Sequence, residues 1–117
     1  MKKIALVTGA NKGIGYEAAK QLAQHNIKVL LAARNNAEGE KAAADLREQS
    51  LDVTFVKLDI SKPVDIENVK NYIKNEFEKL DILINNAGVF LDGDWYGNNV
   101  ETVCCIYFNV GLTKCIC

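Results

Sequence analysis

The stretch KIALVTGANKGIG (residues 3–15) decides the fold of this chain. Its apolar first half, residues 3–8, predicts a buried parallel strand. Its second half spaces three glycines as G-x3-G-x-G. Gly9 allows a sharp turn off the strand, Gly13 lets the backbone approach a pyrophosphate, and Gly15 lets the next helix pack closely on the sheet. A strand leading through such a loop into a helix is typical of a phosphate-binding site.

Helical and strand patterns alternate after this loop. The first helix is expected at 14–25. Ile14, Ala18 and Leu22 are expected to share one face, with Ala19 and Ala23 as further candidates, and His25 and then Asn26 mark the end. We expect a second helix at 36–49, weakened by Gly39. A third helix is expected after a cap at Ser61, and its apolar stripe consists of Ile66, Val69, Ile73, Phe77 and Leu80. Further strands are expected at 28–33, 53–58 and 81–85. The fold class is therefore α/β, half of a doubly wound parallel sheet, with four strands in the order 3-2-1-4.

Length and composition set further limits. The chain has 117 residues, 49% hydrophobic and 25% charged, which suits one globular domain. Its net charge is -1 with no block of lysine or arginine, so neither nucleic acid nor an anionic membrane is an expected partner. The first apolar run is too short for a signal peptide and no other run is long enough to span a bilayer, so a cytoplasmic location is expected.

Two motifs together resemble one known family. Thr8-Gly9-x3-Gly13-x-Gly15 resembles the cofactor motif of the short-chain dehydrogenase/reductases, and Asn85-Asn86-Ala87-Gly88 resembles their second signature. The resemblance covers about residues 1–100, and the loop variant is most similar to the carbonyl-reductase branch. It implies a dinucleotide-binding Rossmann half-domain over residues 1–90.

Charge at the end of the second strand indicates the cofactor. An NAD site typically has an acidic residue there, whereas this strand ends in Arg34. Arg34 and Lys12 suit a 2′-phosphate, which favours NADP(H); the alternative is that both are solvated surface cations. The resemblance implies further cofactor contacts at Asn11, Ile14, Asp59, Ile60, Asn86, Ala87 and Gly88. Asp59 is equally well interpreted as a loop carboxylate or a helix cap near Ser61.

The catalytic residues that the resemblance implies are a serine and a Tyr-x-x-x-Lys motif after a fifth strand. This sequence has Tyr-x-x-x-Lys only at Tyr16 to Lys20, beside the expected pyrophosphate, and we interpret that match as a decoy. Its serines, Ser50 and Ser61, precede the fourth strand, so no catalytic residue is assigned; Asn109 is an unproven candidate for the family's active-site asparagine. The expected function is a fragment of an NADP(H)-dependent oxidoreductase of small carbonyl or alcohol substrates. The alternative is a non-catalytic dinucleotide-binding or association module.

Residues 91–117 differ in composition and in hydrophobic pattern from residues 1–90. A polar loop with Trp95 and Tyr96 precedes a tail that contains all four cysteines: Cys104, Cys105, Cys115 and Cys117. Their spacing lacks the C-x2-4-C pair of a zinc site, so no metal is expected. The change near residue 103 suggests a truncated or frameshifted tail, and its alternative is a genuine unusual one. We expect the fourth strand to be an uncovered, aggregation-prone edge.

Overall fold

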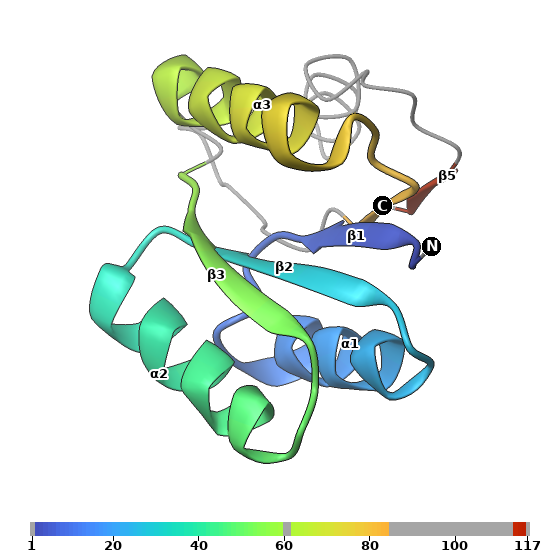
Figure 1. Cartoon of the computed structure of the whole chain (residues 1–117). Helices are drawn as coiled ribbons and strands as arrows, with labels where there is room; N and C mark the ends of the chain where they lie inside the picture. Colours follow the sequence, from blue (N-terminus) through green and yellow to red (C-terminus); the bar gives the residue numbers. More distant parts are fainter. Residues whose placement is uncertain (1, 60–61, 85–113, 117) are drawn as a thin grey trace.

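The computed structural model describes residues 2–59, 62–84 and 114–116, which form a parallel sheet flanked by helices (Figure 1). In chain order the elements are β1 (Ile4–Val7), α1 (Gly13–Gln24), β2 (Lys28–Ala33), α2 (Asn36–Glu48), β3 (Val53–Lys57), α3 (Pro63–Phe77), β4 (Ile82–Ile84) and β5 (Lys114–Ile116). The six of these elements that have an expected range lie within one or two residues of it, and α3 begins just after the expected cap at Ser61.

The sheet has the order β3-β2-β1-β4-β5, so the predicted order 3-2-1-4 is confirmed for the first four strands. All the pairings between neighbouring strands are parallel. The expectation of an uncovered fourth strand is wrong. Lys114–Ile116 pairs with Ile82–Ile84 in parallel register, so β4 has a neighbour on each side. This pairing could not be predicted, because three residues are too few to show a strand pattern.

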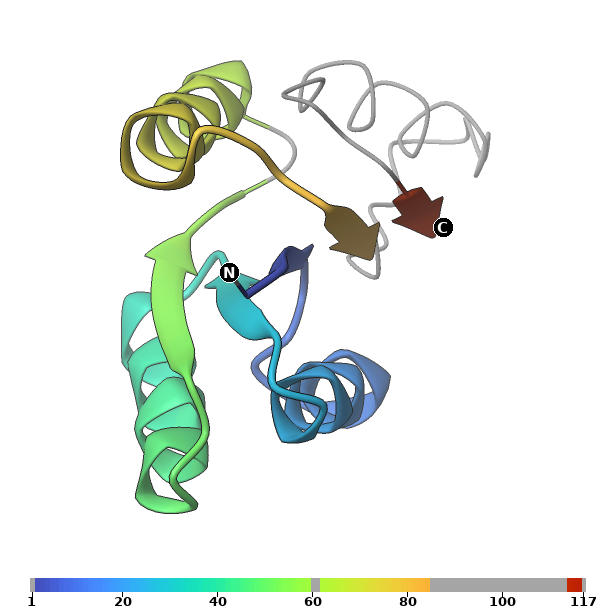
Figure 2. The ribbon, with the colours of Figure 1, turned by 45° about the vertical axis from the view of Figure 1, so that its right-hand side comes forward.

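Helices cover both faces of the sheet, with α1 and α2 on one side and α3 on the other (Figures 1 and 2). Since side chains alternate along a strand, each strand supplies both layers. Leu6, Leu30 and Leu83 pack with Ile66, Val69 and Ile73 of α3. Val7, Val29 and Leu31 pack with Ala19, Ala43 and Leu46 of α1 and α2. The apolar stripe predicted for α3 is confirmed, with Leu80 buried and Phe77 half-buried.

Two details of helix packing differ from the prediction. The buried face of α1 consists of the two further candidates, Ala19 and Ala23, together with Gly15, whereas Ile14 is 82% exposed. The small residues face the sheet because they allow the helix backbone to approach it. Gly39 is also buried, and a Cβ there would overlap the ring of Phe55 on β3. Gly39 therefore permits the close contact of α2 with the sheet, in addition to any loss of helix propensity.

The helix ends follow ordinary capping chemistry. His25 is the C-cap of α1, with Nδ1 2.8 Å from the Gln21 carbonyl oxygen, and Asn26 follows at φ 61°, as predicted. Asn35 caps α2 by accepting the Glu38 N–H at 3.0 Å. The N-cap of α3 is Lys62, and Pro63 occupies its first turn. The predicted cap Ser61 lies outside the described residues.

Candidate nucleotide-binding site

The glycine-rich loop lies where the sheet changes direction of winding. Strand β1 has β2 on one side and β4 on the other, and the loop that follows β1 is fixed to both. The Thr8 N–H donates to the Ile84 carbonyl at 3.0 Å, and the Ala10 N–H donates to the Ala32 carbonyl at 3.0 Å. In open α/β sheets the crevice at such a switch point, at the carboxyl ends of the strands, is where ligands bind.

Two residues of this loop have a left-handed backbone. Gly9 has φ 60° and Gly13 has φ 65°, a region that side chains other than glycine disfavour. A Cβ built on Gly13 would have no atom within 4 Å, so the space beside this residue is open. The glycine is thus required by the backbone conformation, and the same open space leaves room for a ligand at the start of α1.

The first turn of α1 is suited to an anion. Its N-cap, Lys12, makes no capping hydrogen bond through its side chain, and the first turn contains no acidic residue. The first N–H groups of a helix have no partner within the helix and carry a partial positive charge. A loop with two left-handed glycines, leading into such a turn, has the geometry of a pyrophosphate site. The described residues therefore fit the cofactor that the sequence suggests.

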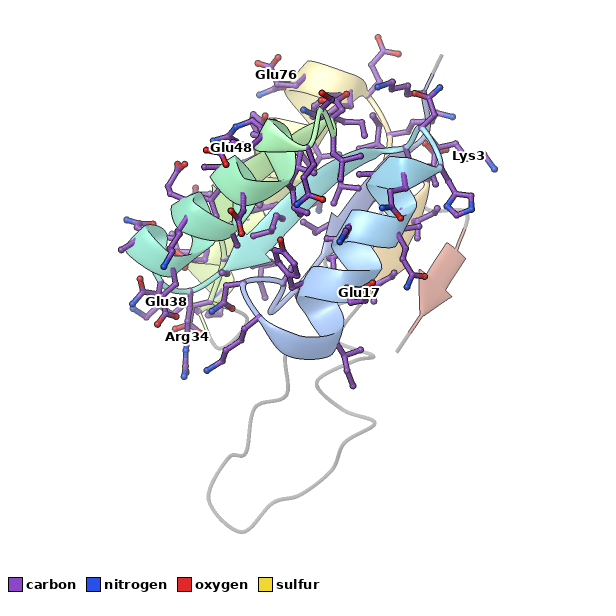
Figure 3. The ribbon with its side chains drawn as sticks, turned by 90° about the horizontal axis from the view of Figure 1, so that it is seen from below. Lys3, Glu17, Arg34, Glu38, Glu48 and Glu76 are labelled. Carbon is purple, nitrogen blue, oxygen red and sulfur yellow. The ribbon has the colours of Figure 1, made fainter. Side chains whose placement is uncertain are left out.

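Lys12 and Arg34 both lie at this edge and both are exposed. Lys12 ends the glycine-rich loop and Arg34 follows β2 immediately. Within the described ranges neither side chain forms an ion pair. Figure 3 shows Arg34 at the end of the molecule where α1 begins, with Lys3 at the opposite end. Two cations on neighbouring segments are thus available to an incoming phosphate.

A side-chain bridge that the sequence analysis missed joins this loop to α2. The Asn11 amide Nδ2 donates to Glu38 Oε2 at 3.0 Å, and the Glu38 N–H donates to Asn35. Asn11 had been expected only as a cofactor contact. The spacing Asn35-x-x-Glu38 at the start of a helix resembles a capping box, which could have drawn attention to Glu38. Its carboxylate instead bonds a residue 27 positions away, which local spacing does not reveal.

Asp59 follows β3 at the same edge of the sheet. Its N–H donates to Asp65 Oδ2 at 3.0 Å, and Asp65 also pairs with Lys57 at 3.5 Å. The N-cap position of α3 is occupied by Lys62. The Lys62 N–H donates to the Asp59 carbonyl at 2.9 Å, which makes Asp59 part of a tight turn before the helix.

The predicted cofactor contacts Ile60, Asn86, Ala87 and Gly88 lie outside the described residues. So do other residues that the sequence singles out, namely Asn85, Trp95, Tyr96, Cys104, Cys105, Asn109 and Cys117. Cys115 belongs to β5, of which only the backbone is described. In the part of the chain that is described, no three His, Cys, Asp or Glu side chains form a group that could hold a metal ion. No described helix is long and apolar enough to cross a membrane.

The Tyr16–Lys20 match lies on α1, where the surroundings of Tyr16 do not lower the pKa of its phenol. Tyr16 is half-buried against the face shared with α2. Burial raises the pKa of the Tyr16 phenol above its ordinary value, and the nearby carboxylate of Asp45 raises it further. A tyrosine that acts as a proton donor near neutral pH needs a pKa shifted the other way. This direction supports the interpretation of the match as a decoy.

Comparison with known proteins identifies the family. The sequence pattern of the family described as short chain dehydrogenase matches residues 3–109. The chain belongs to the short-chain dehydrogenase family. The (+)-neomenthol dehydrogenase of Capsicum annuum is 44% identical over 99 residues, which cover 79% of this chain and 32% of that protein.

Solved structures of the short-chain dehydrogenase family agree with the fold. Menthone neomenthol reductase from Mentha piperita matches with a TM-score of 0.73 at 41% identity, over 76% of this chain and 32% of that one. L-sorbose reductase from Gluconobacter frateurii, complexed with NADPH and L-sorbose, matches with a TM-score of 0.79 at 27% identity, over 94% of this chain and 46% of that one. The chain thus spans about a third of the length of the curated relatives it matches.

Proposed function

We propose that residues 1–90 bind NADP(H), and that this chain is the cofactor-binding part of an oxidoreductase that transfers hydride between the nicotinamide and a small carbonyl or alcohol substrate. The observation that carries the proposal is the loop at the switch point. There, Gly9 and Gly13 hold a left-handed backbone in front of a helix N-terminus, with two exposed cations beside it. Anion recognition at this place is what a pyrophosphate requires.

Arg34 and Lys12 support NADP(H) rather than NAD(H). A guanidinium can donate two parallel hydrogen bonds to a phosphate, and Arg34 stands where an NAD site has a carboxylate. Two structural relatives, L-sorbose reductase and actinorhodin polyketide ketoreductase, are described in complex with NADPH. Asn86, Ala87 and Gly88 remain proposed cofactor contacts on the basis of the family signature, as do Ile14, Asp59 and Ile60.

When bound, the cofactor supplies the hydride. The chain's own residues bind and orient it: the loop N–H groups hold the pyrophosphate, and Arg34 with Lys12 holds the 2′-phosphate. The proton donor of the reaction is not assigned to any of these 117 residues, because Tyr16 and Lys20 lie on α1 and no other Tyr-x-x-x-Lys is present. The proposal is therefore that this chain binds the cofactor without turning it over.

Cofactor titrations test the binding proposal. The full chain is titrated with NADPH and with NADH, and the quenching or transfer of nucleotide fluorescence gives the two dissociation constants. Arg34→Ala is expected to weaken NADPH binding by roughly ten- to a hundredfold and NADH binding by less than twofold. Lys41→Ala is the control, because it removes an exposed cation from α2 without touching the loop. An unchanged NADPH/NADH affinity ratio in Arg34→Ala contradicts the choice of NADP(H).

Turnover tests whether these 117 residues are catalytic by themselves, which cofactor binding alone does not show. NADPH oxidation is followed with a panel of aldehydes and ketones. No rate above the cofactor's own decay is expected from these 117 residues. A clear rate that Arg34→Ala lowers would contradict the absence of a proton donor and would show that the chain itself is catalytic.

A further inference from the structure

Glu38 stands out because it is an acidic residue beside a site built for phosphate. It lies in the first turn of α2, whose N-terminus follows directly on Arg34. Figure 3 shows Arg34 and Glu38 at the same end of the molecule. Glu38 lies only four positions after Arg34 in the chain, so an ion pair between the two side chains would be an ordinary surface interaction. In the part of the chain described here it forms none, and the carboxylate bonds the neutral amide of Asn11 instead.

Two properties of Glu38 follow from this geometry. Through Asn11 the carboxylate ties the glycine-rich loop to α2, because Asn11 lies between the two left-handed glycines and its amide donates across at 3.0 Å. The helix end of the bridge is itself fixed, because Asn35 accepts the Glu38 N–H. The second property is charge: the bridge keeps a negative charge near Arg34 without neutralising it.

We propose that Glu38 sets the cofactor preference of this site: its carboxylate holds the loop through Asn11 and, by its charge, weakens the binding of a 2′-phosphate relative to a 2′-hydroxyl. The inference rests on the proposed NADP(H) site. A phosphate at this place meets the attraction of two exposed cations, Arg34 and Lys12, and the repulsion of one exposed carboxylate, Glu38. Because both groups face solvent, the repulsion is moderate and depends on ionic strength.

The two properties can be separated by substitution. Glu38→Gln keeps an oxygen that accepts from Asn11 and removes only the charge, whereas Glu38→Ala removes both. Asn11→Ala removes the bridge and keeps the charge. Glu40→Gln is the matched control, because it removes the same charge from an exposed residue two positions further along α2 that pairs with Arg47 at 3.9 Å.

Dissociation constants for NADPH and NADH are measured for the full chain and these four variants at low and at physiological ionic strength. Glu38→Gln is expected to tighten NADPH binding by roughly three- to tenfold at low salt, less at higher salt, and to leave NADH within twofold. Glu38→Ala is expected to give the same change in the NADPH/NADH ratio with weaker binding of both. Asn11→Ala is expected to weaken both cofactors without changing the ratio.

The inference is overturned if Glu38→Gln changes the ratio no more than Glu40→Gln does, or if the change does not shrink with salt. It is also overturned if Asn11→Ala changes the ratio as much as Glu38→Gln, since the loop rather than the charge would then set the preference. The underlying NADP(H) site fails in a different way, namely by the unmodified chain binding neither nucleotide or by Arg34→Ala having no effect on the ratio.

Discussion

Charged groups at the two edges of the sheet differ in their pairing, although Lys57 at the carboxyl end of β3 also pairs with Asp65. At the amino ends of the strands, Lys28 and Asp81 are both paired. Lys28 donates to Asp52 at 2.9 Å and to Thr54 at 2.6 Å, and Asp81 accepts from Lys79 at 2.9 Å and from the Ile4 N–H at 2.8 Å. At the carboxyl ends, Lys12 and Arg34 are exposed and form no ion pair among the described residues.

The difference in pairing distinguishes charges that stabilise the fold from charges that are available to bind a ligand. A buried charge is tolerated only when it is hydrogen-bonded and paired, so Asp81, which is 3% exposed, contributes to stability through its partners. An exposed cation contributes little to stability and remains free to bind a phosphate. The amino edge is therefore expected to respond to substitution in unfolding experiments, and the carboxyl edge in binding experiments.

The largest expected effect is the loss of Asp81. In Asp81→Ala the N–H of Ile4, the first residue of β1, loses its hydrogen-bond acceptor, and Lys79 loses its ion-pair partner. The free energy of unfolding is expected to fall by about 2–3 kcal/mol, as measured by urea denaturation of the full chain. Asp81→Asn keeps an acceptor for Ile4 and is expected to lose about half as much. Equal losses in both variants would show that the charge, not the acceptor, carries the contribution.

A second substitution tests the close contact between α2 and the sheet at Gly39. Gly39→Ala would raise helix propensity, but its Cβ would overlap the Phe55 ring. We expect the overlap to dominate, with a loss of about 1–2 kcal/mol in urea denaturation. The double variant Gly39→Ala, Phe55→Leu should recover part of the loss because the ring is gone. A Gly39→Ala variant more stable than the original chain would mean that the ring moves aside at little cost.

These residues also mark the limit of what the sequence could predict. The alternation of apolar periods, and the family's two motifs, were sufficient for the strand order, the elements and the loop, because those signals are local. The Gly39–Phe55 contact, the Asn11–Glu38 bridge and the β4–β5 pairing each join residues far apart in the chain. Local patterns also placed Ile14, rather than Gly15, on the buried face of α1, because they weigh Ile14 as apolar and Gly15 as neutral.

The pH dependence of stability offers a smaller effect at the amino edge. Burial raises the pKa of Asp81, but the bonds from the Ile4 N–H and from Lys79, with Lys3 nearby, outweigh it and hold the pKa below the ordinary 3.8. A group with a lowered pKa stabilises the fold above its unfolded value and loses that contribution as the pH falls through its folded value. The difference in urea midpoint between the original chain and Asp81→Asn should be constant near neutral pH and shrink below about pH 4. A difference that stays constant down to pH 2.5 would contradict the lowered pKa.

The smallest effect comes from comparing one lysine at each edge. Lys28→Met removes a cation whose side chain is 16% exposed and bonded to Asp52 and Thr54, so about 1 kcal/mol of stability should be lost. Lys12→Met removes an exposed cation with no ion pair among the described residues, and urea denaturation should detect no change. Titration with NADPH should give the reverse order, with weaker binding in Lys12→Met and unchanged binding in Lys28→Met. If Lys12→Met instead destabilises the chain while leaving NADPH affinity unchanged, Lys12 belongs with the structural charges, and Arg34 alone carries the argument for the 2′-phosphate.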